Sequence, residues 1–277
     1  VGDSVFQNAI TSQMQVHNLV QTCFDKYSIT NYAIMYPNDP YGLEFANLFW
    51  DEVVARGGQI RAVQAYRTGE TDFRNIIQRM VGLFYLDERA DEYKLRLEKW
   101  KTDPDRPQHT RNNKPPEDLL PPIVDFQALF IPDGAKALGQ IAPMLAYNNV
   151  KGIKLIGPNL WNTKALVERG EKFVENSLFI DSYLDEKSIS ESAFYQEYKE
   201  SFGEEPAFIS VLAYEAAQAL RLAIERGETT RIGVTSRLSR MQEFKGVLGS
   251  LSVNGKREFS RPLTLLTVTN GVITPIQ

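Results

Sequence analysis

The sequence predicts an α/β fold, in which a mostly parallel sheet is covered by helices on both faces. Through the first two thirds of the chain, apolar runs of strand length alternate with amphipathic stretches of helix length. Helices that connect successive strands of one sheet make those strands parallel and come to lie on the sheet's faces. The 277 residues are 43% hydrophobic and 24% charged, a composition typical of globular proteins.

The expected strands of this region are short and mostly apolar. Residues 31–36 form an almost continuous apolar run, which is typical of a strand buried on both faces. Residues 37–42 form a turn rich in proline and glycine, and Gly57 and Gly58 close the helix that follows it. The expected strands cover residues 31–36, 59–65, 128–131, 154–157 and 178–181, and the expected helices cover residues 12–27, 41–56, 73–80 and 134–147.

The last third of the chain has a different pattern. Asn270 and Gly271 predict a tight hairpin, because both residue types tolerate positive φ. The expected helices cover residues 190–202, 209–226 and 235–241, and the expected strands cover 247–253, 263–269 and 272–276. The second of these helices is predicted to be buried because it is rich in small apolar residues, namely Ala216, Ala217, Ala219, Leu220 and Ala223.

Residues 87–122 interrupt the alternation with a segment dense in charge and proline. Residues 87–101 are compatible with a surface helix, with Leu95, Leu97 and Trp100 as its few apolar contacts, and residues 103–122 with an extended or disordered loop. We interpret the whole segment as an insertion. It is either a solvated excursion or an element that docks a partner.

The composition excludes several classes of function. The net charge of −4 argues against a nucleic-acid-binding protein, and no apolar run approaches the ~18–20 residues that span a bilayer. His17 and His109 are the only histidines, and neither lies in a metal-binding or catalytic-triad pattern. Cys23 is expected to be a buried structural thiol. We therefore expect neither an enzyme nor a protein with a cofactor or metal.

Candidate ligand-binding residues follow the ends of the expected strands. Asp133 could accept a ligand amine or cap its own helix, whereas Asp72 fits a helix cap better. Trp161 could present its ring to a ligand, between two amides that both donate and accept hydrogen bonds. The candidates are Tyr36, Tyr41, Asp72, Asp133, Asn159, Trp161 and Asn162.

Several segments resemble the second lobe of branched-chain amino-acid-binding proteins, within the type I periplasmic-binding-protein family. These segments are residues 31–42, 69–73, 155–158 and 244–249 with Asn254 and Gly255. The resemblance implies two similar α/β lobes joined by three crossings, with a ligand in the cleft between them. Residues 12–182 and 245–277 would form the second lobe, with the charged insertion, and residues 183–244 the C-terminal part of the first. The N-terminal strands of the first lobe have no counterpart, so we expect a fragment of a longer protein.

The resemblance leaves two functional hypotheses. The first is a periplasmic receptor that delivers a small polar ligand, such as an amino acid, to the membrane subunits of an ABC transporter. The second is a lipoprotein that activates a penicillin-binding protein, a peptidoglycan synthase, without any small ligand. Either protein would be peripheral to the membrane through an upstream lipid anchor. Asn159 stands where amino-acid binders of the family carry a glutamate for the ligand ammonium, which weakens the case for a free amino acid.

Overall fold

The computed structural model describes residues 4–103, 115–116, 119–182 and 190–276 of the chain. The chain divides into two compact units. We call residues 16–179 and 266–274 the sheet unit, and residues 1–15, 180–265 and 275–277 the hairpin unit.

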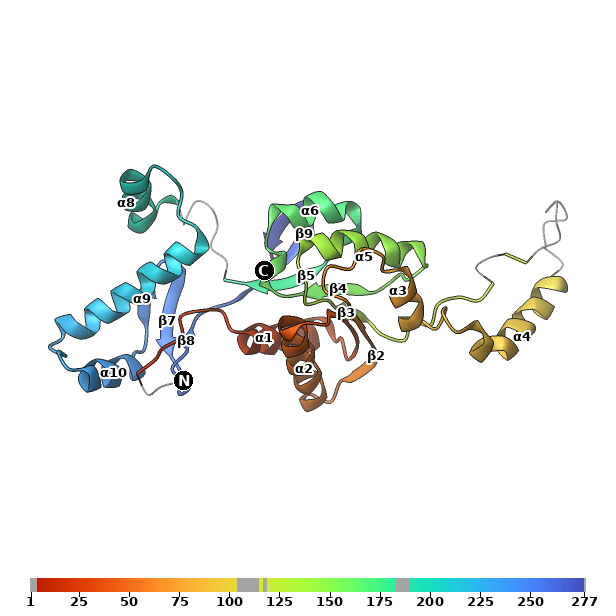
Figure 1. Cartoon of the computed structure of the whole chain (residues 1–277), viewed down its shortest axis with the longest axis horizontal. Coiled ribbons are helices and arrows are strands. Elements are labelled where there is room, and N and C mark those ends of the chain that lie inside the picture. The colour runs from red at the N-terminus through yellow and green to blue at the C-terminus, as the bar shows by residue number, and fades with distance from the viewer. Residues whose placement is uncertain (1–3, 104–114, 117–118, 183–189, 277) are drawn as a thin grey trace. The chain divides into compact units, whose positions relative to one another are not determined.

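The sheet unit is built on a seven-stranded sheet with the order β10-β9-β5-β4-β3-β1-β2 (Figure 1). The pairs β1–β2, β1–β3, β3–β4 and β4–β5 are all parallel, which confirms the mostly parallel sheet predicted from the sequence. The strands are β1 (Asn31–Pro37), β2 (Gln59–Tyr66), β3 (Ala128–Phe130), β4 (Lys154–Gly157), β5 (Leu178–Asp181), β9 (Thr264–Thr269) and β10 (Val272–Pro275).

Helices cover both faces of this sheet, as the alternation of elements predicts. In Figure 1, α1 and α2 lie on one side of the strands and α3, α5 and α6 on the other. The bounds are α1 (Ser12–Tyr27), α2 (Pro40–Ala55), α3 (Arg74–Met80), α5 (Ala135–Tyr147) and α6 (Lys164–Gly170), with short 3-10 turns η2 (Asn159–Trp161) and η3 (Glu171–Val174). Helix α6, which was not predicted from the sequence, packs against α5.

Aromatic rings fill the core between α2 and the sheet. The Phe49 and Phe130 rings stack at 4.1 Å between centroids, and the Tyr32 ring meets Phe49 edge-on at 5.4 Å. Cys23 is buried beside this cluster, as predicted for a structural thiol. Burial raises the pKa of its thiol to about 12, so the group stays neutral and unreactive.

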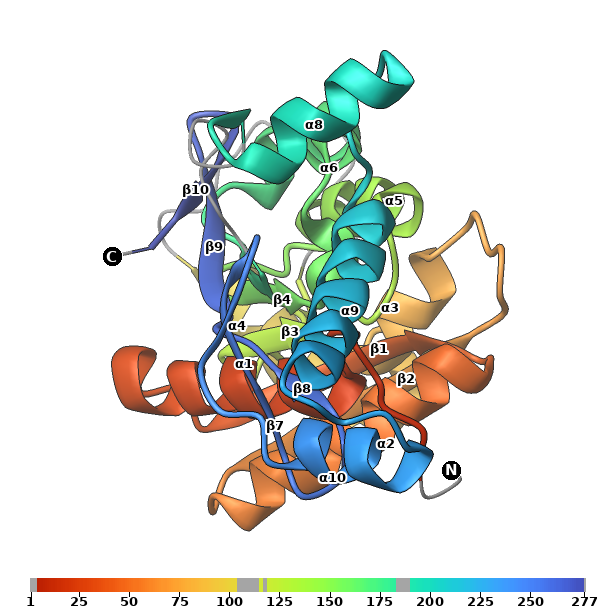
Figure 2. The ribbon, with the colours of Figure 1, turned by 90° about the vertical axis from the view of Figure 1, so that its left-hand side faces the viewer.

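In its described residues, the hairpin unit places α8, α9 and α10 with a small antiparallel sheet of order β6-β7-β8. Figure 2 shows α9 beside the β7–β8 hairpin. The core between them contains Ala219 and Ala223 of α9 with Phe244, Leu251, Val253 and Phe259 of the strands. The elements are α8 (Ala193–Phe202), α9 (Phe208–Glu225), α10 (Arg231–Ser239), β6 (Phe244–Gly246), β7 (Gly249–Val253) and β8 (Phe259–Ser260).

The two compact units do not coincide with the lobe boundaries expected from the sequence, which stay a prediction. Residues 245–277 were all expected in the second lobe, yet residues 245–265 belong to the hairpin unit because their apolar side chains pack against α9. The expected strand 247–253 begins later than predicted, as β7 at Gly249, because residues 247 and 248 form the turn that joins it to β6. The third helix starts earlier than expected, because the Thr230 hydroxyl accepts a hydrogen bond from the Gly233 N–H and caps it.

Helix α9 is buried on one side only. Ala219 and Ala223 are buried, whereas Leu220 is 45% and Ile224 48% exposed. Ile209, near the helix start, is 69% exposed. An apolar stripe along α9 therefore faces outward from the described residues of the hairpin unit.

The insertion begins with a 3-10 turn, η1 (Leu86–Arg89), followed by α4 (Ala90–Lys101). Helix α4 projects from the sheet unit in Figure 1 and has no buried residue, so the expected surface helix is confirmed. Most of the loop expected over residues 103–122 falls on 104–114 and 117–118, which lie outside the described residues.

Candidate functional site

The sheet unit has a topological switch point between β1 and β3. The chain passes from β1 to β2 on one side and later places β3 on the other, so the strand order reverses there. In open α/β sheets, ligands bind in the crevice beyond the carboxyl ends of the strands at such a point. The residues that follow β1, β2 and β3 therefore define the candidate site.

Asp133 connects three loops at this edge of the sheet. Its Oδ2 accepts a hydrogen bond of 2.7 Å from the hydroxyl of Tyr66, the last residue of β2. Its Oδ1 accepts from the N–H of Gly134 at 2.6 Å, and its carbonyl oxygen accepts from Nε1 of Trp161 at 2.8 Å. The Asp133 carboxylate is thus held in a fixed position where β1, β2 and β3 end.

This geometry rules out one of the two roles considered for Asp133. The residue that caps α5 is Gly134, and no side chain bonds to the first turn of that helix. The helix-cap interpretation of Asp133 is therefore wrong. Its carboxylate, partly exposed, is left with Tyr66 as its side-chain partner.

The pKa values of two tyrosines show that several carboxylates lie near this edge. Burial raises the pKa of Tyr66, and the charge of Asp133, its hydrogen bond and the charge of Asp39 raise it further. Burial likewise raises the pKa of Tyr41, with the carboxylates of Asp133, Glu44 and Asp39 adding to the effect. Both phenols therefore remain protonated donors near several carboxylates. Tyr66 was not among the residues predicted from the sequence, because only the pairing of β2 with β1 brings it to Asp133.

Trp161 lies at the same edge, but its ring is fully buried. The indole packs over Gly157, where an added Cβ would lie 2.2 Å from Trp161 Cε2, and its centroid is 6.1 Å from that of Phe179. Trp161 therefore holds the loop after β4 against the loop after β3. Asn159 and Asn162, at either end of the η2 turn, are partly exposed.

The remaining predicted residues divide into two groups. Tyr36 is partly exposed near the end of β1, and Tyr41 stands in the first turn of α2, 37% exposed, with its ring 4.7 Å from that of Phe45. Asp72 instead accepts a hydrogen bond of 3.1 Å from the Arg74 N–H at the start of α3. The N-cap of α3 is nevertheless Phe73, with no side-chain cap, so the helix-cap interpretation of Asp72 is wrong.

Asp39 fixes the loop that follows β1. Its Oδ1 caps α2 by accepting from the Gly42 N–H at 2.8 Å, and its Oδ2 accepts from the Thr68 hydroxyl at 3.1 Å. Gly42 is required here, since a Cβ would lie 2.0 Å from the Pro37 carbonyl oxygen. The turn after β1 is thereby joined to the loop after β2.

The described residues include no group of three or more histidine, cysteine, aspartate or glutamate side chains placed to hold a metal ion. Among the described helices, none combines the length and apolar character needed to cross a membrane.

Solved structures share this fold at low sequence identity. Leucine-binding protein LivK from Thermotoga maritima aligns at 18% identity with a TM-score of 0.63, covering 99% of this chain and 67% of that one. A periplasmic binding protein type 1 from Bordetella pertussis aligns at 16% and 0.64, covering 99% and 68%. A solute-binding protein of an ABC transporter from R. palustris, solved with benzoate, aligns at 12% and 0.61, covering 99% and 65%.

These alignments cover nearly all of this chain and about two thirds of each solved structure. No protein-family model matches the chain. No curated protein matches it either.

Proposed function

We propose that this chain, which has the type I periplasmic-binding-protein fold, is the ligand-binding part of an extracytoplasmic solute receptor and not an enzyme. The ligand would be a small polar molecule bound beyond the carboxyl ends of β1, β2 and β3. The partner would be the membrane subunits of an ABC transporter, and the location the periplasm. The structural relatives named above are binding proteins by their descriptions, which supports this proposal.

The observation that carries the proposal is the position of Asp133. A carboxylate held by Tyr66 at the switch point of a parallel sheet lies where open α/β sheets bind their ligands. Asp39 and Glu44 add negative charge, as the raised pKa of Tyr41 indicates. The site therefore favours a ligand that carries an ammonium group, because a charged donor bonds a carboxylate about twice as strongly as a neutral one.

An amino acid satisfies this requirement even though Asn159 cannot supply a countercharge. Asp133 can take that role, because the Tyr66 hydroxyl occupies only part of the hydrogen-bonding capacity of Oδ2. The other predicted residues at this edge, Tyr36, Tyr41, Asn159 and Asn162, would then orient the ligand. The alternative function considered from the sequence, activation of a peptidoglycan synthase, stays a prediction.

Calorimetric titration with leucine and with isocaproate, which is leucine without its amino group, tests the proposal. We expect leucine to bind and isocaproate to bind at least tenfold more weakly. Asp133→Asn removes the charge and keeps one acceptor oxygen, for either the Tyr66 hydroxyl or the Gly134 N–H, so leucine affinity should fall by at least tenfold, about 1.4 kcal/mol.

Asp125→Asn is the matched control, because Asp125 is an exposed carboxylate of the same unit, paired with Arg61 at 2.7 Å. It should leave leucine affinity unchanged. Tighter binding of isocaproate than of leucine, or equal leucine binding by wild type and Asp133→Asn, would show that Asp133 does not recognise an ammonium group.

A further inference from the structure

Strand β2 forms a free edge of the seven-stranded sheet. It is the last strand in the sheet order, and β1 is its neighbour on the inner side. Among the described residues, none outside the sheet forms a backbone hydrogen bond to residues 60–65. Strand β2 is eight residues long, and an edge strand of that length presents a row of N–H and C=O groups that can pair with another strand.

This edge has little of the protection that sheet edges usually carry, namely charged side chains, proline or a bulge. Strand β2 has no proline and one charged residue, Arg61, whose guanidinium is paired with the Asp125 carboxylate at 2.7 Å. The irregularity in its pairing with β1 lies at the step from Tyr32 to Ala33, near the start of the strand. Residues 62–65 are therefore open to pairing with another chain.

Helix α2 adds an exposed apolar surface next to this edge. Leu43, Trp50 and Val54 follow one another at intervals of seven and four residues, so they lie along one side of the helix. They are 40%, 44% and 53% exposed. We call these three residues the α2 stripe. Adjoining exposed apolar residues that include a tryptophan are typical of a protein-binding surface.

The α2 stripe lies on the side of the helix that faces the β2 edge. Glu52 projects from the opposite side, two residues before Val54, and its Oε1 lies 3.0 Å from Nδ1 of His17 on α1. Helix α1 in turn lies toward β4, since the Tyr27 ring is 6.0 Å from the Lys154 ammonium, whereas α2 packs on β1 and β2. The stripe therefore overhangs the free edge of the sheet.

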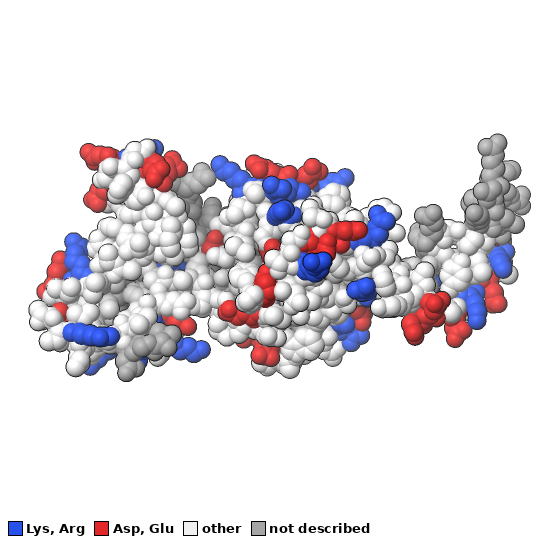
Figure 3. All heavy atoms as spheres, viewed as in Figure 1, with Lys and Arg blue, Asp and Glu red and all other residues white. Residues whose placement is uncertain are grey.

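The charges of α2 and β2 indicate the chemistry of the partner. These two elements contain four charged residues, of which Glu52 is paired with Arg56 at 2.8 Å and Arg61 is paired as described. The other two, Glu44 and Asp51, are exposed and form no ion pair with any described residue. Each follows a residue of the α2 stripe by one position and so borders the stripe on its solvent side. Acidic side chains are visible in Figure 3 on the lower side of the sheet unit, where Figure 1 places α2.

We propose that the β2 edge and the α2 stripe together bind an extended, basic segment of another protein. The backbone of that segment would pair with β2 and continue the sheet. Alternate side chains of a strand point to the same face, so apolar ones would pack beneath the α2 stripe. Lysine or arginine side chains of the partner would reach Glu44 and Asp51, which would select this partner over an acidic one.

Two other occupants fit the observations less well. A symmetric contact between two copies would place the same patch on both sides, and so bring Glu44 and Asp51 of one copy against those of the other. A helix would leave the edge unpaired, because its own N–H and C=O groups are bonded within the helix.

Binding of designed peptides to the whole chain tests the proposal. One labelled peptide, roughly ten residues long, alternates valine with lysine, and its twin carries glutamate in place of lysine. Fluorescence anisotropy should show binding of the basic peptide and at least tenfold weaker binding of the acidic one. Amide hydrogen exchange of residues 60–65 should slow when the basic peptide is bound, because their outward N–H groups become paired.

N-methylation of the basic peptide separates strand pairing from mere charge attraction. Successive N–H groups of a strand point to opposite edges, so methylating alternate residues blocks one edge and methylating the others blocks the second. One of these two peptides should bind at least tenfold more weakly than the parent, and the other, blocked on the edge that faces away from β2, should bind within about twofold of it.

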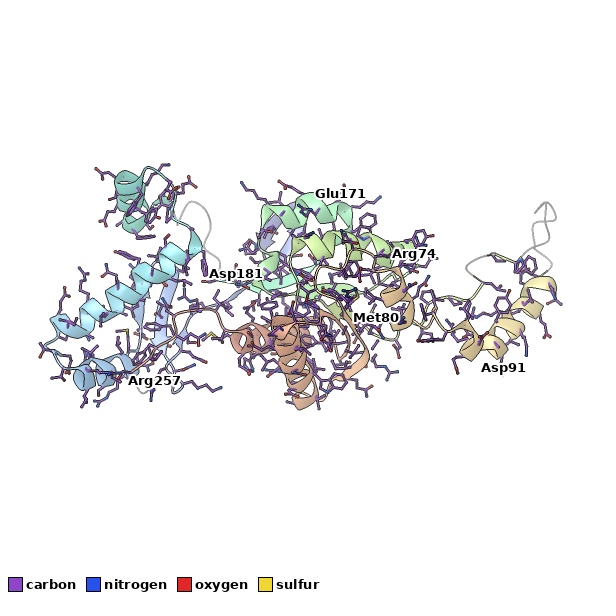
Figure 4. The ribbon with its side chains drawn as sticks, viewed as in Figure 1. Arg74, Met80, Asp91, Glu171, Asp181 and Arg257 are labelled. Carbon is purple, nitrogen blue, oxygen red and sulfur yellow. The ribbon has the colours of Figure 1, made fainter. Side chains whose placement is uncertain are left out.

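Two exposed leucines on helices of the sheet unit provide a matched pair of variants. Leu43→Ser removes part of the α2 stripe and should weaken binding of the basic peptide at least tenfold. Leu95 is 66% exposed on α4, one turn from Asp91, which Figure 4 labels, so Leu95→Ser should change the affinity less than twofold. Asp51→Lys changes only a surface charge and should weaken binding of the basic peptide while strengthening that of the acidic one.

Several results would overturn the proposal. These are no binding of the basic peptide, equal binding of the basic and acidic peptides, equal binding of the two N-methylated peptides, or equal losses from Leu43→Ser and Leu95→Ser. Self-association in sedimentation equilibrium that Trp50→Ser abolishes would make a second copy the occupant of this edge.

Discussion

Glu215 and Arg261 form an ion pair in which both side chains are fully buried in the hairpin unit. Arg261 Nη1 lies 3.1 Å from Glu215 Oε2, and Glu215 Oε1 accepts a hydrogen bond of 3.0 Å from the Leu248 N–H. Arg261 also donates to the side chain of Asn8, which in turn bonds to the Leu212 carbonyl oxygen. The pair thus ties α9 to the β6–β7 turn and to two segments distant in sequence.

Removing one member of this pair should be costly. Arg261→Met leaves a buried, unpaired carboxylate, and we expect the free energy of unfolding to fall by about 3–5 kcal/mol in urea denaturation. The double variant Glu215→Leu/Arg261→Met should recover most of that loss, because no buried charge remains. Arg221→Met is the control, since the Arg221–Glu225 pair is exposed and worth ~0–1 kcal/mol. A double variant no more stable than Arg261→Met would contradict this account.

Cys23 should make stability depend on alkaline pH. The folded-state pKa of about 12 lies above the ~8.5 of an unfolded thiol. Its contribution to stability is therefore fully present below pH ~8.5 and is lost as pH rises toward the folded value. Between those limits, wild type should lose about 1.4 kcal/mol per pH unit relative to Cys23→Ala, measured by urea denaturation at several pH values. Parallel pH profiles for the two proteins would contradict burial of the thiol.

At the scale of single residues, the sequence predicted which residues follow the strand ends, but it did not predict what each of their side chains contacts. Asp133 follows a strand, and its position was predictable from that alone. That Gly134 and not Asp133 caps α5, and that Tyr66 bonds to Asp133, depends on how β2 and β3 lie beside β1. Trp161 illustrates the same limit, because a loop tryptophan can be exposed or buried, and contact with Gly157 buries this one.

The elements of the sheet unit follow local rules closely. Strand lengths, the turn before α2 and the Asn270–Gly271 hairpin were all readable from residue type and spacing. Helix α6, of seven residues, was not anticipated from the sequence. Helix α4 was recognised as a surface helix, but only the structure shows that its Ala90, Tyr93 and Leu97 line a groove on the sheet unit.

The N-cap of helix α2 provides a test of how much a local side-chain hydrogen bond stabilises the fold. Asp39→Ala removes the side chain that caps α2 and accepts from Thr68, so the free energy of unfolding should fall by about 1 kcal/mol. Asp39→Asn keeps an oxygen acceptor and should lose only a small part of this. Urea denaturation of the three proteins measures the difference, and equal losses for alanine and asparagine would show that the cap bond is not the cause.

For the molecule as a whole, the exposed stripe of α9 is the feature with the clearest consequence. Exposed apolar side chains that adjoin one another favour association. Leu220→Lys/Ile224→Lys should therefore lower concentration-dependent self-association, measured by light scattering after size exclusion, without lowering stability. Val54→Lys, at a residue 53% exposed on α2 of the sheet unit, should leave association unchanged. Association that persists in the double lysine variant would assign it to another surface.

The sequence by itself determined the class of fold, the sheet unit's strands and main helices, and the strand ends that hold the candidate site. Each of these depends on contacts between near neighbours or on apolar periodicity, which residue order records directly. Tertiary structure decided the rest: the assignment of residues 245–265 to the hairpin unit, the two-sided character of α9, the buried Glu215–Arg261 pair and the groove beside α4. These features join residues far apart in the chain. Local sequence patterns do not determine which distant helix and strand faces pack together.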